Sequence, residues 1–266
     1  MKIVELIENN LKSPLLLSEH GLAVYVEVDN ERWLLDTGQS NKILHNAEVL
    51  EIDLSAINLN GIVISHGHYD HAGGAGYIVD ALKRDGREVP AIYAHSGARR
   101  PKWSVSERMV KSNGWARAAE LGDMGYIRWL PSGVHRISRK LTLFTLPGDA
   151  PVNPHLSLST DESGAIDGLI PDNFEDELFA LLTSENGETL LYGGCTHHGL
   201  AQLLQYAFNV LGCGHIDKFV GGLHLMGRSE KEIAKAIATV RGYDVREWIV
   251  NHCTGPVAEE MWKKLR

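Results

Sequence analysis

The chain has 266 residues, of which 44% are hydrophobic and 23% charged, and its formal net charge is -8. These values are typical of a soluble globular protein and exclude a disordered or fibrous chain. The acidic balance argues against a nucleic-acid partner, because phosphate backbones are normally bound by basic surfaces. At this length, one domain spanning residues 1–266 is the expected organisation.

Three features bear on where the protein works. Residues Met1–Glu8 place acidic side chains within a short apolar alternation, which predicts a strand and not a secretory signal. No apolar run approaches the length needed to span a bilayer, so a membrane partner is not expected. The odd, sparse set of Cys195, Cys213 and Cys253 favours a reducing compartment over a disulfide framework. We therefore expect a cytoplasmic protein.

Apolar patterning in the first third predicts strands that end in polar residues. The alternation Ala23–Val28 and the run Trp33–Leu35 predict a hairpin, whose second strand delivers Asp36 to its end. The continuous apolar run Gly61–Ser65 predicts a short buried strand that leads directly into a group of histidines. Helices are expected at residues 41–50 and 75–83.

Two segments in the middle of the chain are predicted to cover a site. Residues 95–125 are polar and irregular, and they predict a loop-and-helix insertion. Residues 147–176 are rich in Pro and Asp and predict a second, flexible cover. Long segments of this kind are commonly functional. Strands are expected between them, at residues 126–130, 134–137 and 141–146.

The last third alternates between strands and helices. Strands are expected at residues 178–183, 189–192, 216–220 and 248–250, and helices at 199–211, 229–240 and 256–264. Strands in the first half followed by mixed strand and helix units predict an α/β (α+β) fold. In that fold two mixed sheets pack face to face, with helices outside.

The segment His66-Gly67-His68-Tyr69-Asp70-His71 sets three imidazoles and one carboxylate within six residues, directly after the buried strand. Imidazole and carboxylate together form a ligand set suited to zinc, iron or manganese, and the glycine permits a tight turn. The alternative is a solvated polar loop that happens to be rich in histidine. The further histidines that follow strands favour the metal site.

This His-x-His-x-Asp-His pattern, with Leu35-Asp36-Thr37-Gly38 upstream, resembles the signature of the metallo-β-lactamase superfamily. The resemblance implies a four-layer αββα sandwich with two metal ions at one edge, between the sheets. It also implies that His66 and His68 bind one metal ion, and that Asp70 and His71 bind the other.

Three later strand ends also carry histidine, in the segments 193–199, 221–225 and 251–255. They are similar to motifs of the superfamily branch that includes dihydropterin-ribofuranosylaminobenzene phosphate synthase. This likeness implies that His197 completes the first metal site and that His252 completes the second.

Two ligand assignments stay open. The superfamily's usual Pro-Gly-His is replaced here by Pro147-Gly148-Asp149, so either Asp149 or His197 supplies the third ligand. We favour His197, because imidazole is the usual partner of two other imidazoles. Cys195 lies where many relatives carry a further ligand, but we favour a structural role, because a small buried cysteine at a strand end is often simply part of the core.

Two residues are expected to support the chemistry without completing a metal site. Asp36 ends a buried strand, where an unpaired carboxylate is costly, so we expect it to orient a ligand histidine or a bound water. His224 has no obvious metal vacancy; it is either a proton donor that faces the substrate or a structural histidine.

The leading functional hypothesis is metal-dependent hydrolysis of a phosphate-type or ester bond in a small, anionic substrate. Two divalent metal ions, with zinc favoured over iron or manganese, would lower the pKa of a shared water towards about 7 and provide a metal-bound hydroxide. Literal β-lactamase activity is not expected. The sequence specifies neither the natural substrate nor an oligomeric state.

The branch likeness implies an alternative, a transferase that joins a pterin methyl carbon to an aromatic phosphoribosyl acceptor and displaces diphosphate. Basic residues at 99, 100 and 102 would then hold a phosphate, and Trp103, Trp115 or Tyr126 would stack on a flat ring. A third reading is a non-catalytic metal-binding protein, since function does not follow from fold alone. The complete cluster, Asp70 included, argues against it.

Overall fold

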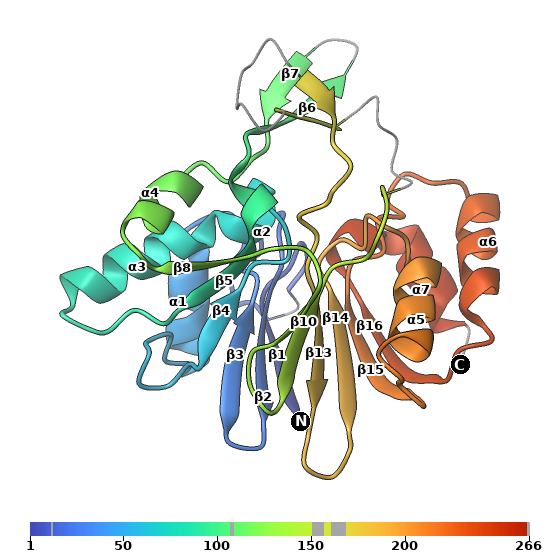
Figure 1. Cartoon of the computed structure of the whole chain (residues 1–266), viewed down its shortest axis with the longest axis horizontal. Coiled ribbons are helices and arrows are strands. Elements are labelled where there is room, and N and C mark those ends of the chain that lie inside the picture. The colour runs from blue at the N-terminus through green and yellow to red at the C-terminus, as the bar shows by residue number, and fades with distance from the viewer. Residues whose placement is uncertain (12, 107–108, 151–156, 161–168, 265–266) are drawn as a thin grey trace.

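The computed structural model describes residues 1–11, 13–106, 109–150, 157–160 and 169–264. Two six-stranded sheets face each other, and each is covered on its outer side by helices (Figure 1). A smaller four-stranded sheet stands above them. The two large sheets are mixed, and their four-layer arrangement confirms the fold class expected from the sequence.

The first sheet has the strand order β1-β2-β3-β4-β5-β8. Its first three strands pair antiparallel, and from β3 onward the strands run parallel. The strand bounds are β1 (Lys2–Ile7), β2 (Ala23–Val28), β3 (Glu31–Leu35), β4 (Gly61–Val63), β5 (Ile92–His95) and β8 (Ile127–Leu130). Helices α1 (Lys42–Val49), α3 (Gly74–Arg84) and α4 (Ala118–Asp123) cover its outer face. Strand β5 is absent from the sequence prediction.

The second sheet has the order β16-β15-β14-β13-β10-β9. The three last strands of the chain run parallel, and the others pair antiparallel. The bounds are β9 (Val134–Arg136), β10 (Leu141–Phe144), β13 (Phe179–Thr183), β14 (Thr189–Gly193), β15 (Ile216–Gly221) and β16 (Val245–Val250). Helices α5 (Leu200–Asn209), α6 (Glu230–Val240) and α7 (Pro256–Lys263) pack on the outside.

The alternation of side chains along each strand explains how the four layers pack together. In β2, Val24 and Val26 pack between the sheets, whereas Ala23 and Tyr25 pack under the helices of the first sheet. Successive side chains of a strand point to opposite faces, so one apolar strand serves two cores. A third core joins the second sheet to its helices. Burial of apolar surface in all three holds the four layers together.

The small sheet corrects the prediction for the middle of the chain. Its strands are β6 (Lys102–Ser106), β7 (Met109–Ser112), β11 (Ser157–Thr160) and β12 (Leu169–Pro171), and we call it the lid sheet. A loop and helix were expected over residues 95–125, which is wrong for residues 102–106 and 109–112. The pairing of β6 with β11 joins segments that are far apart in sequence, so local patterns do not reveal it. Of the predicted cover 147–176, residues 151–156 and 161–168 lie outside the described residues.

The boundaries of the predicted insertion also differ from those of the lid sheet. His95 ends β5 within the first sheet, and its side chain caps the short 3-10 helix η1 (Ser96–Arg99). Helix α4 packs into the core of that sheet through Leu121. Both ends of the predicted insertion therefore belong to the main body.

A buried ion cluster fixes the lid sheet to the main body. Lys102, at the start of β6, is only 2% exposed, and its ammonium lies 2.6 Å from Asp172 and 2.9 Å from Asp176. The same ammonium lies 5.2 Å from the ring centre of Phe174. Buried charges are tolerated when they are paired, so this cluster requires all three charged groups.

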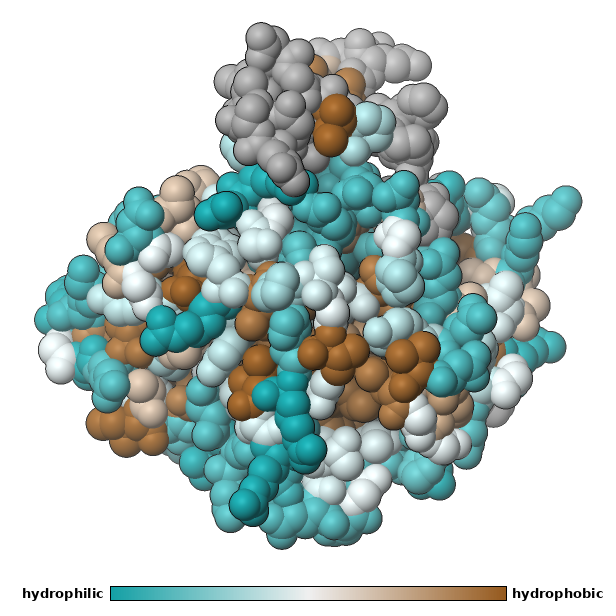
Figure 2. Space-filling view, in the orientation of Figure 1, coloured by the Kyte–Doolittle hydropathy of each residue, from teal (hydrophilic) through white to brown (hydrophobic). Residues whose placement is uncertain are grey.

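The described helices include none with the length and hydropathy needed to cross a membrane. The face seen in Figure 2 is mostly hydrophilic, with separate hydrophobic areas across the main body. This pattern agrees with amphipathic helices that turn their polar faces outward.

Replacing Lys102 with alanine should lower the free energy of unfolding by about 3–5 kcal/mol, because two buried carboxylates lose their cation. Denaturant unfolding measures this change. Arg117→Ala is the matched control, since Arg117 pairs with the exposed carboxylates of Asp80 and Glu120, and it should cost less than about 1 kcal/mol. Equal losses in the two variants would contradict the role assigned to Lys102.

Candidate metal centre

Strand ends from both large sheets meet at one edge of the sandwich. In the first sheet, Asp36 follows β3, and the segment that begins at His66 follows β4. In the second sheet, His197 follows β14, His224 follows β15 and His252 follows β16. Carboxyl ends of neighbouring parallel strands lie at the same edge of a sheet, so the fold gathers residues that are distant in sequence.

The first cluster consists of His66, His68 and His197. Nε2 of His66 lies 3.0 Å from Nδ1 of His68 and 3.3 Å from Nε2 of His197. Tetrahedral zinc with bonds of about 2.0–2.1 Å separates neighbouring nitrogens by about 3.3–3.4 Å. The three nitrogens therefore have the spacing of ligands around one cation.

The histidines of the first cluster are in the form that binds metal. Burial lowers the pKa of His66 and His197 well below the usual value, and burial together with the charge of Lys102 lowers that of His68 to about 3. All three rings are therefore neutral. Nδ1 of His66 lies 2.9 Å from the Ser65 hydroxyl, which leaves Nε2 free to accept a cation.

The second cluster consists of Asp70, His71 and His252. Nε2 of His71 lies 3.2 Å from Nε2 of His252, and Oδ2 of Asp70 lies 3.4 Å and 4.0 Å from these two nitrogens. The short helix α2 (Tyr69–Ala72) carries Asp70 and His71, and the 3-10 helix η3 (His252–Thr254) begins with His252. Two imidazoles and one carboxylate thus face one another.

Partners outside the second cluster orient its rings. Nδ1 of His71 lies 2.7 Å from Oδ2 of Asp36, and Nδ1 of His252 lies 3.0 Å from Oδ1 of Asn9. These contacts place a proton on Nδ1 and turn each Nε2 towards the cluster. Burial opposes a charge on His71, but the carboxylates of Asp36 and Asp70 raise its pKa to about 9.

Asp36 lies at the centre of a buried hydrogen-bond network. It accepts hydrogen bonds from the backbone and hydroxyl of Ser65, both at 2.7 Å, and from the Tyr192 hydroxyl at 2.6 Å. Its backbone is left-handed, with φ of 58°. Few residues other than glycine adopt this conformation, and where one does, its surroundings hold it in place. Asp36 was expected to orient a histidine or a bound water, and its contact with Nδ1 of His71 is of the first kind.

Buried carboxylates also hold the loops that carry the histidines. Asp176 accepts the backbone N–H of Gly67 at 2.8 Å, and Glu177 accepts that of His197 at 2.7 Å. Glu8 accepts the N–H of His252 at 2.9 Å. Sequence reasoning missed all three carboxylates, because each lies far from its partner along the chain.

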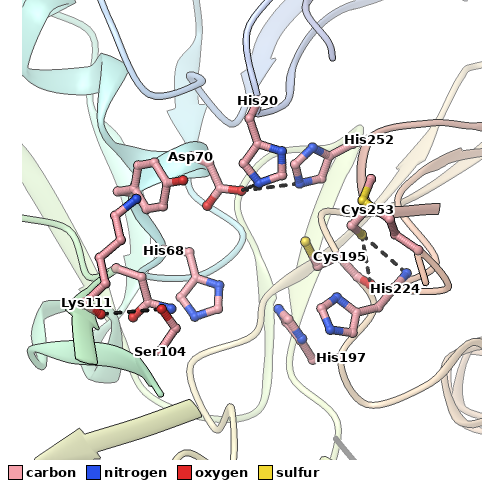
Figure 3. Close-up of a pocket in the computed structure, with 13 residues that line it drawn as sticks. His20, His68, Asp70, Ser104, Lys111, Cys195, His197, His224, His252 and Cys253 are labelled. Carbon is pink, nitrogen blue, oxygen red and sulfur yellow. Dashed lines mark hydrogen bonds and ion pairs between the residues drawn. The ribbon is translucent and has the colours of Figure 1, made fainter. Parts of the chain in front are cut away.

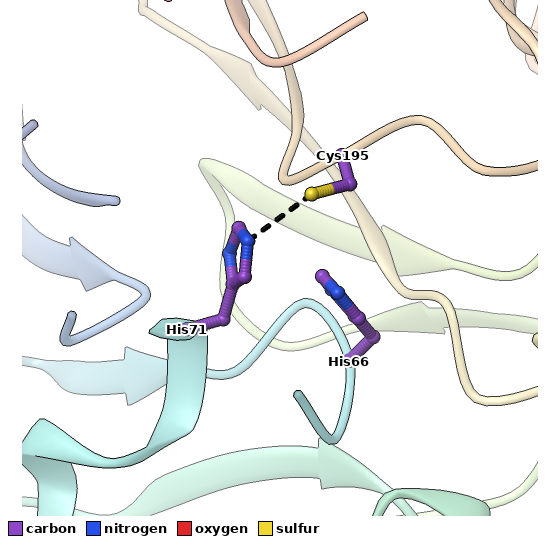
Figure 4. Close-up of side chains that lie close together, drawn as sticks. All are labelled: His66, His71 and Cys195. Atoms are coloured by element: carbon purple, nitrogen blue, oxygen red, sulfur yellow. Dashed lines mark hydrogen bonds between the residues drawn. The ribbon is translucent and has the colours of Figure 1, made fainter. Parts of the chain in front are cut away.

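Cys195 lies between the two clusters. Its sulfur is 3.2 Å from Nε2 of His71, and His66 approaches the same position (Figure 4). The structure therefore places Cys195 within reach of the second cluster, where a thiolate would complete a nitrogen and oxygen ligand set. Cys253, by contrast, accepts the backbone N–H of His224 at 3.3 Å.

His20 is a site residue that sequence reasoning missed. Its Nε2 lies 3.1 Å from Oδ2 of Asp70, and its ring centre lies 4.9 Å from that of His252 (Figure 3). The backbone keeps it there, since the N–H of Leu22 donates to the carbonyl of Asp70. A single histidine in a loop before β2 gives no periodic signal, so only its spatial position reveals it.

Several expected residues lie away from the clusters. Asp149 is exposed and bonds to Asn173, whereas His197 lies beside His66. Of the residues suggested to bind phosphate or a flat ring, some are committed elsewhere. Lys102 is buried with two aspartates, Arg100 pairs with Glu175, and Trp115 and Tyr126 pack into the core of the first sheet.

A pocket of about 390 Å³ opens onto both clusters (Figure 3). The clusters line it through His68, His197, Asp70 and His252, and the lid sheet lines it through β6 and β7. His224 also lines it, with its ring centre 4.6 Å from that of His197. The converging nitrogen, carboxylate and sulfur donors of this site fit divalent cations, and a cation at the second cluster would displace the proton that Asp36 and Asp70 favour on His71.

Asp36→Asn should weaken binding at the second cluster about 10–100-fold, because His71 loses the acceptor that orients it. Metal titration against a chromophoric chelator measures this affinity. Tyr192→Phe is the control, because it removes another hydrogen bond to the same carboxylate without touching His71. It should lower stability by about 1 kcal/mol and leave metal affinity unchanged. Equal effects on metal affinity would contradict the orienting role.

His20→Ala should weaken binding at the second cluster by about tenfold and change the visible spectrum of the Co²⁺-substituted protein, because a nitrogen next to that cluster is lost. His45→Ala, on the exposed surface of α1, should change neither. If His20→Ala leaves the affinity and the spectrum unaltered, His20 does not contribute to metal binding and only forms a hydrogen bond with Asp70.

Several known proteins are similar to this chain. The chain is 27% identical to 7,8-dihydropterin-6-methyl-4-(beta-D-ribofuranosyl)-aminobenzene-5'-phosphate synthase of Methanocaldococcus jannaschii, over 92% of this chain and 84% of that protein. It is also 27% identical to the crystal structure of Tm1679, a metal-dependent hydrolase of the beta-lactamase superfamily, with a TM-score of 0.78 and coverage of 98% and 91%. Zn²⁺-bound PqqB from Methylobacterium extorquens, 14% identical, shares the fold with a TM-score of 0.54 and coverage of 99% and 93%. The family model of the metallo-beta-lactamase superfamily matches residues 19–200, and the chain belongs to this superfamily.

Proposed function

We propose that this chain is a metal-dependent hydrolase that cleaves a phosphate-type or other ester bond in a small anionic molecule. One observation carries the proposal: a single pocket opens onto donors of the first and the second cluster together. A substrate whose scissile bond lies in this pocket can contact both clusters at once, as displacement at a two-metal site requires.

Two divalent cations fit the donor sets, and zinc is favoured by the nitrogen-rich, tetrahedral spacing. His66, His68 and His197 would hold one cation, and Asp70, His71 and His252 the other, with His20 and Cys195 beside it. When bound, such cations act as Lewis acids on an ester or phosphoryl oxygen and make water more acidic.

The protein's own residues would position the reacting groups. Asp70 bonds to His20 at the floor of the pocket and joins the two histidine-bearing edges. His224 lines the opposite side with its backbone fixed to Cys253, so its ring could bind the substrate or donate a proton to the leaving group. Asp36 acts through His71, whose ring it orients.

A transferase that displaces diphosphate is the second candidate. The likeness to a synthase over 92% of the chain favours it. Trp115 is buried and Tyr126 packs, partly buried, against the same core. This weighs against the transferase, because these two rings are not free to stack on a pterin. We place hydrolysis first for this reason. The three free cysteines and the acidic net charge also support a reducing, cytoplasmic location and a small-molecule substrate rather than a nucleic acid.

Elemental analysis of the purified protein should find about two transition-metal ions per chain, and these should support hydrolysis of bis(4-nitrophenyl) phosphate or 4-nitrophenyl phosphate. Asp70→Ala should lose the second ion and reduce turnover at least about 100-fold, with unfolding unchanged. Asp80→Ala, on the exposed face of α3, is the matched control and should keep both ions and full activity.

Two results would overturn the proposal. Full activity in Asp70→Ala would exclude the two-metal mechanism. Metal without hydrolysis, but with diphosphate release from a pterin diphosphate and an aminobenzene ribosyl phosphate, would establish the transferase instead.

A further inference from the structure

The pocket has two chemically different walls. One wall carries the metal-ligand candidates from the two large sheets, together with His224. The other wall comes from the lid sheet and contains Ser104, Lys111 and the adjoining Asn113. In Figure 3, Lys111 and Ser104 lie on one side of the labelled group, and Cys253 and His224 lie on the opposite side. A substrate held at the clusters can therefore extend towards the lid wall.

Lys111 differs from the other basic residues near the lid. Lys102 is paired with two buried aspartates, Arg100 with Glu175, and Arg117 with Asp80 and Glu120. Within the described part of the chain, the Lys111 ammonium forms no ion pair, and it lies 5.1 Å from the ring centre of Tyr69. An ammonium on an aromatic face keeps its N–H donors available to an anion.

Backbone contacts fix the chain next to Lys111 relative to the metal-ligand loop. The N–H of Tyr69 donates to the carbonyl of Asn113 at 2.9 Å, and His68 forms a β-bridge with Gly114. The N–H of Asn113 in turn donates to the carbonyl of Lys102, at the anchored start of β6. Lys111 is thus two residues from a direct link to the loop that carries His68 and Asp70.

The same wall contains a second polar group without a partner. Oδ1 of Asn113 is buried and has no hydrogen-bond partner among the described residues. Because this oxygen is shielded from solvent, a ligand in the open pocket does not reach it. The Lys111 ammonium is therefore the group of the lid wall that is available to an anion.

We infer that the lid wall is a subsite for a second anionic group of the substrate, bound by Lys111 at the end of the molecule away from the reacting ester. The assignment rests on the proposed function, since it takes the clusters as the place where the ester is held. The substrate class is then an ester with a distal phosphate or carboxylate.

Equilibrium binding to the metal-loaded protein tests this subsite without requiring turnover. The probes are methylphosphonate, a series of ω-carboxyalkylphosphonates of increasing length and the matching alkyl bisphosphonates. One length in either series should bind wild-type protein about tenfold more tightly than methylphosphonate, because a charge-assisted hydrogen bond is added. Lys111→Met should abolish this gain and leave methylphosphonate binding within about twofold. The gain should also fall as salt increases.

Lys235→Met, which removes an equal charge from the exposed face of α6, is the matched control and should retain the gain. Lys111→Arg should retain most of the gain.

The series that binds more tightly distinguishes a distal carboxylate from a distal phosphate. If no length gains affinity in the wild type, or if the gain survives in Lys111→Met, the subsite is excluded. A gain that depends on Lys111 in a protein without hydrolase activity would support the subsite and overturn the hydrolase.

Discussion

One buried carboxylate connects the two sheets with the metal centre. Asp36 follows a strand of the first sheet and accepts a hydrogen bond from Tyr192 of the second sheet, and Ser65 and His71 bond to the same group. An unpaired carboxylate is costly in this dry environment, so the network requires all of its donors. The carboxylate that links the two sheets through Tyr192 also contacts Nδ1 of His71, and this second contact directs Nε2 of His71 towards the second cluster.

Other buried carboxylates accept hydrogen bonds around the site in the same way. Asp176, Glu177 and Glu8 each accept a backbone N–H from a loop that carries a candidate ligand. Several residues at these strand ends have left-handed backbones, including Thr196 with φ of 54° and His252 with φ of 51°. Such conformations cost about 1–3 kcal/mol each, and a hydrogen bond to a charged group contributes about 1.5–3 kcal/mol. Buried carboxylates thus stabilise loop shapes that the backbone alone would not keep.

Local patterns in the sequence predicted the layered fold and the groups that follow its strands. The cluster around His66 could be found because its members are neighbours in sequence, and His252 because it follows a recognisable strand. His20 and Glu177 could not be found, since each acts through a partner distant in sequence and neither belongs to a repeating pattern. The lid sheet was missed for a related reason, because β6 acquires its partner β11 only in the folded chain.

The lid sheet and the metal centre are built from different parts of the fold, yet they share backbone contacts. The donors are set by strand ends of the two large sheets, whereas the opposite wall of the pocket is set by β6 and β7. The link from Tyr69 to Asn113 is a backbone hydrogen bond, so it does not depend on the side chains that the lid carries. A common fold does not determine a reaction. Here the residues of β6 and β7 that line the pocket belong to a segment outside the two large sheets, and such segments commonly carry function. Under the proposed function, the choice between hydrolysis and transfer would therefore depend on the lid wall, which lines the pocket beside the candidate metal centre.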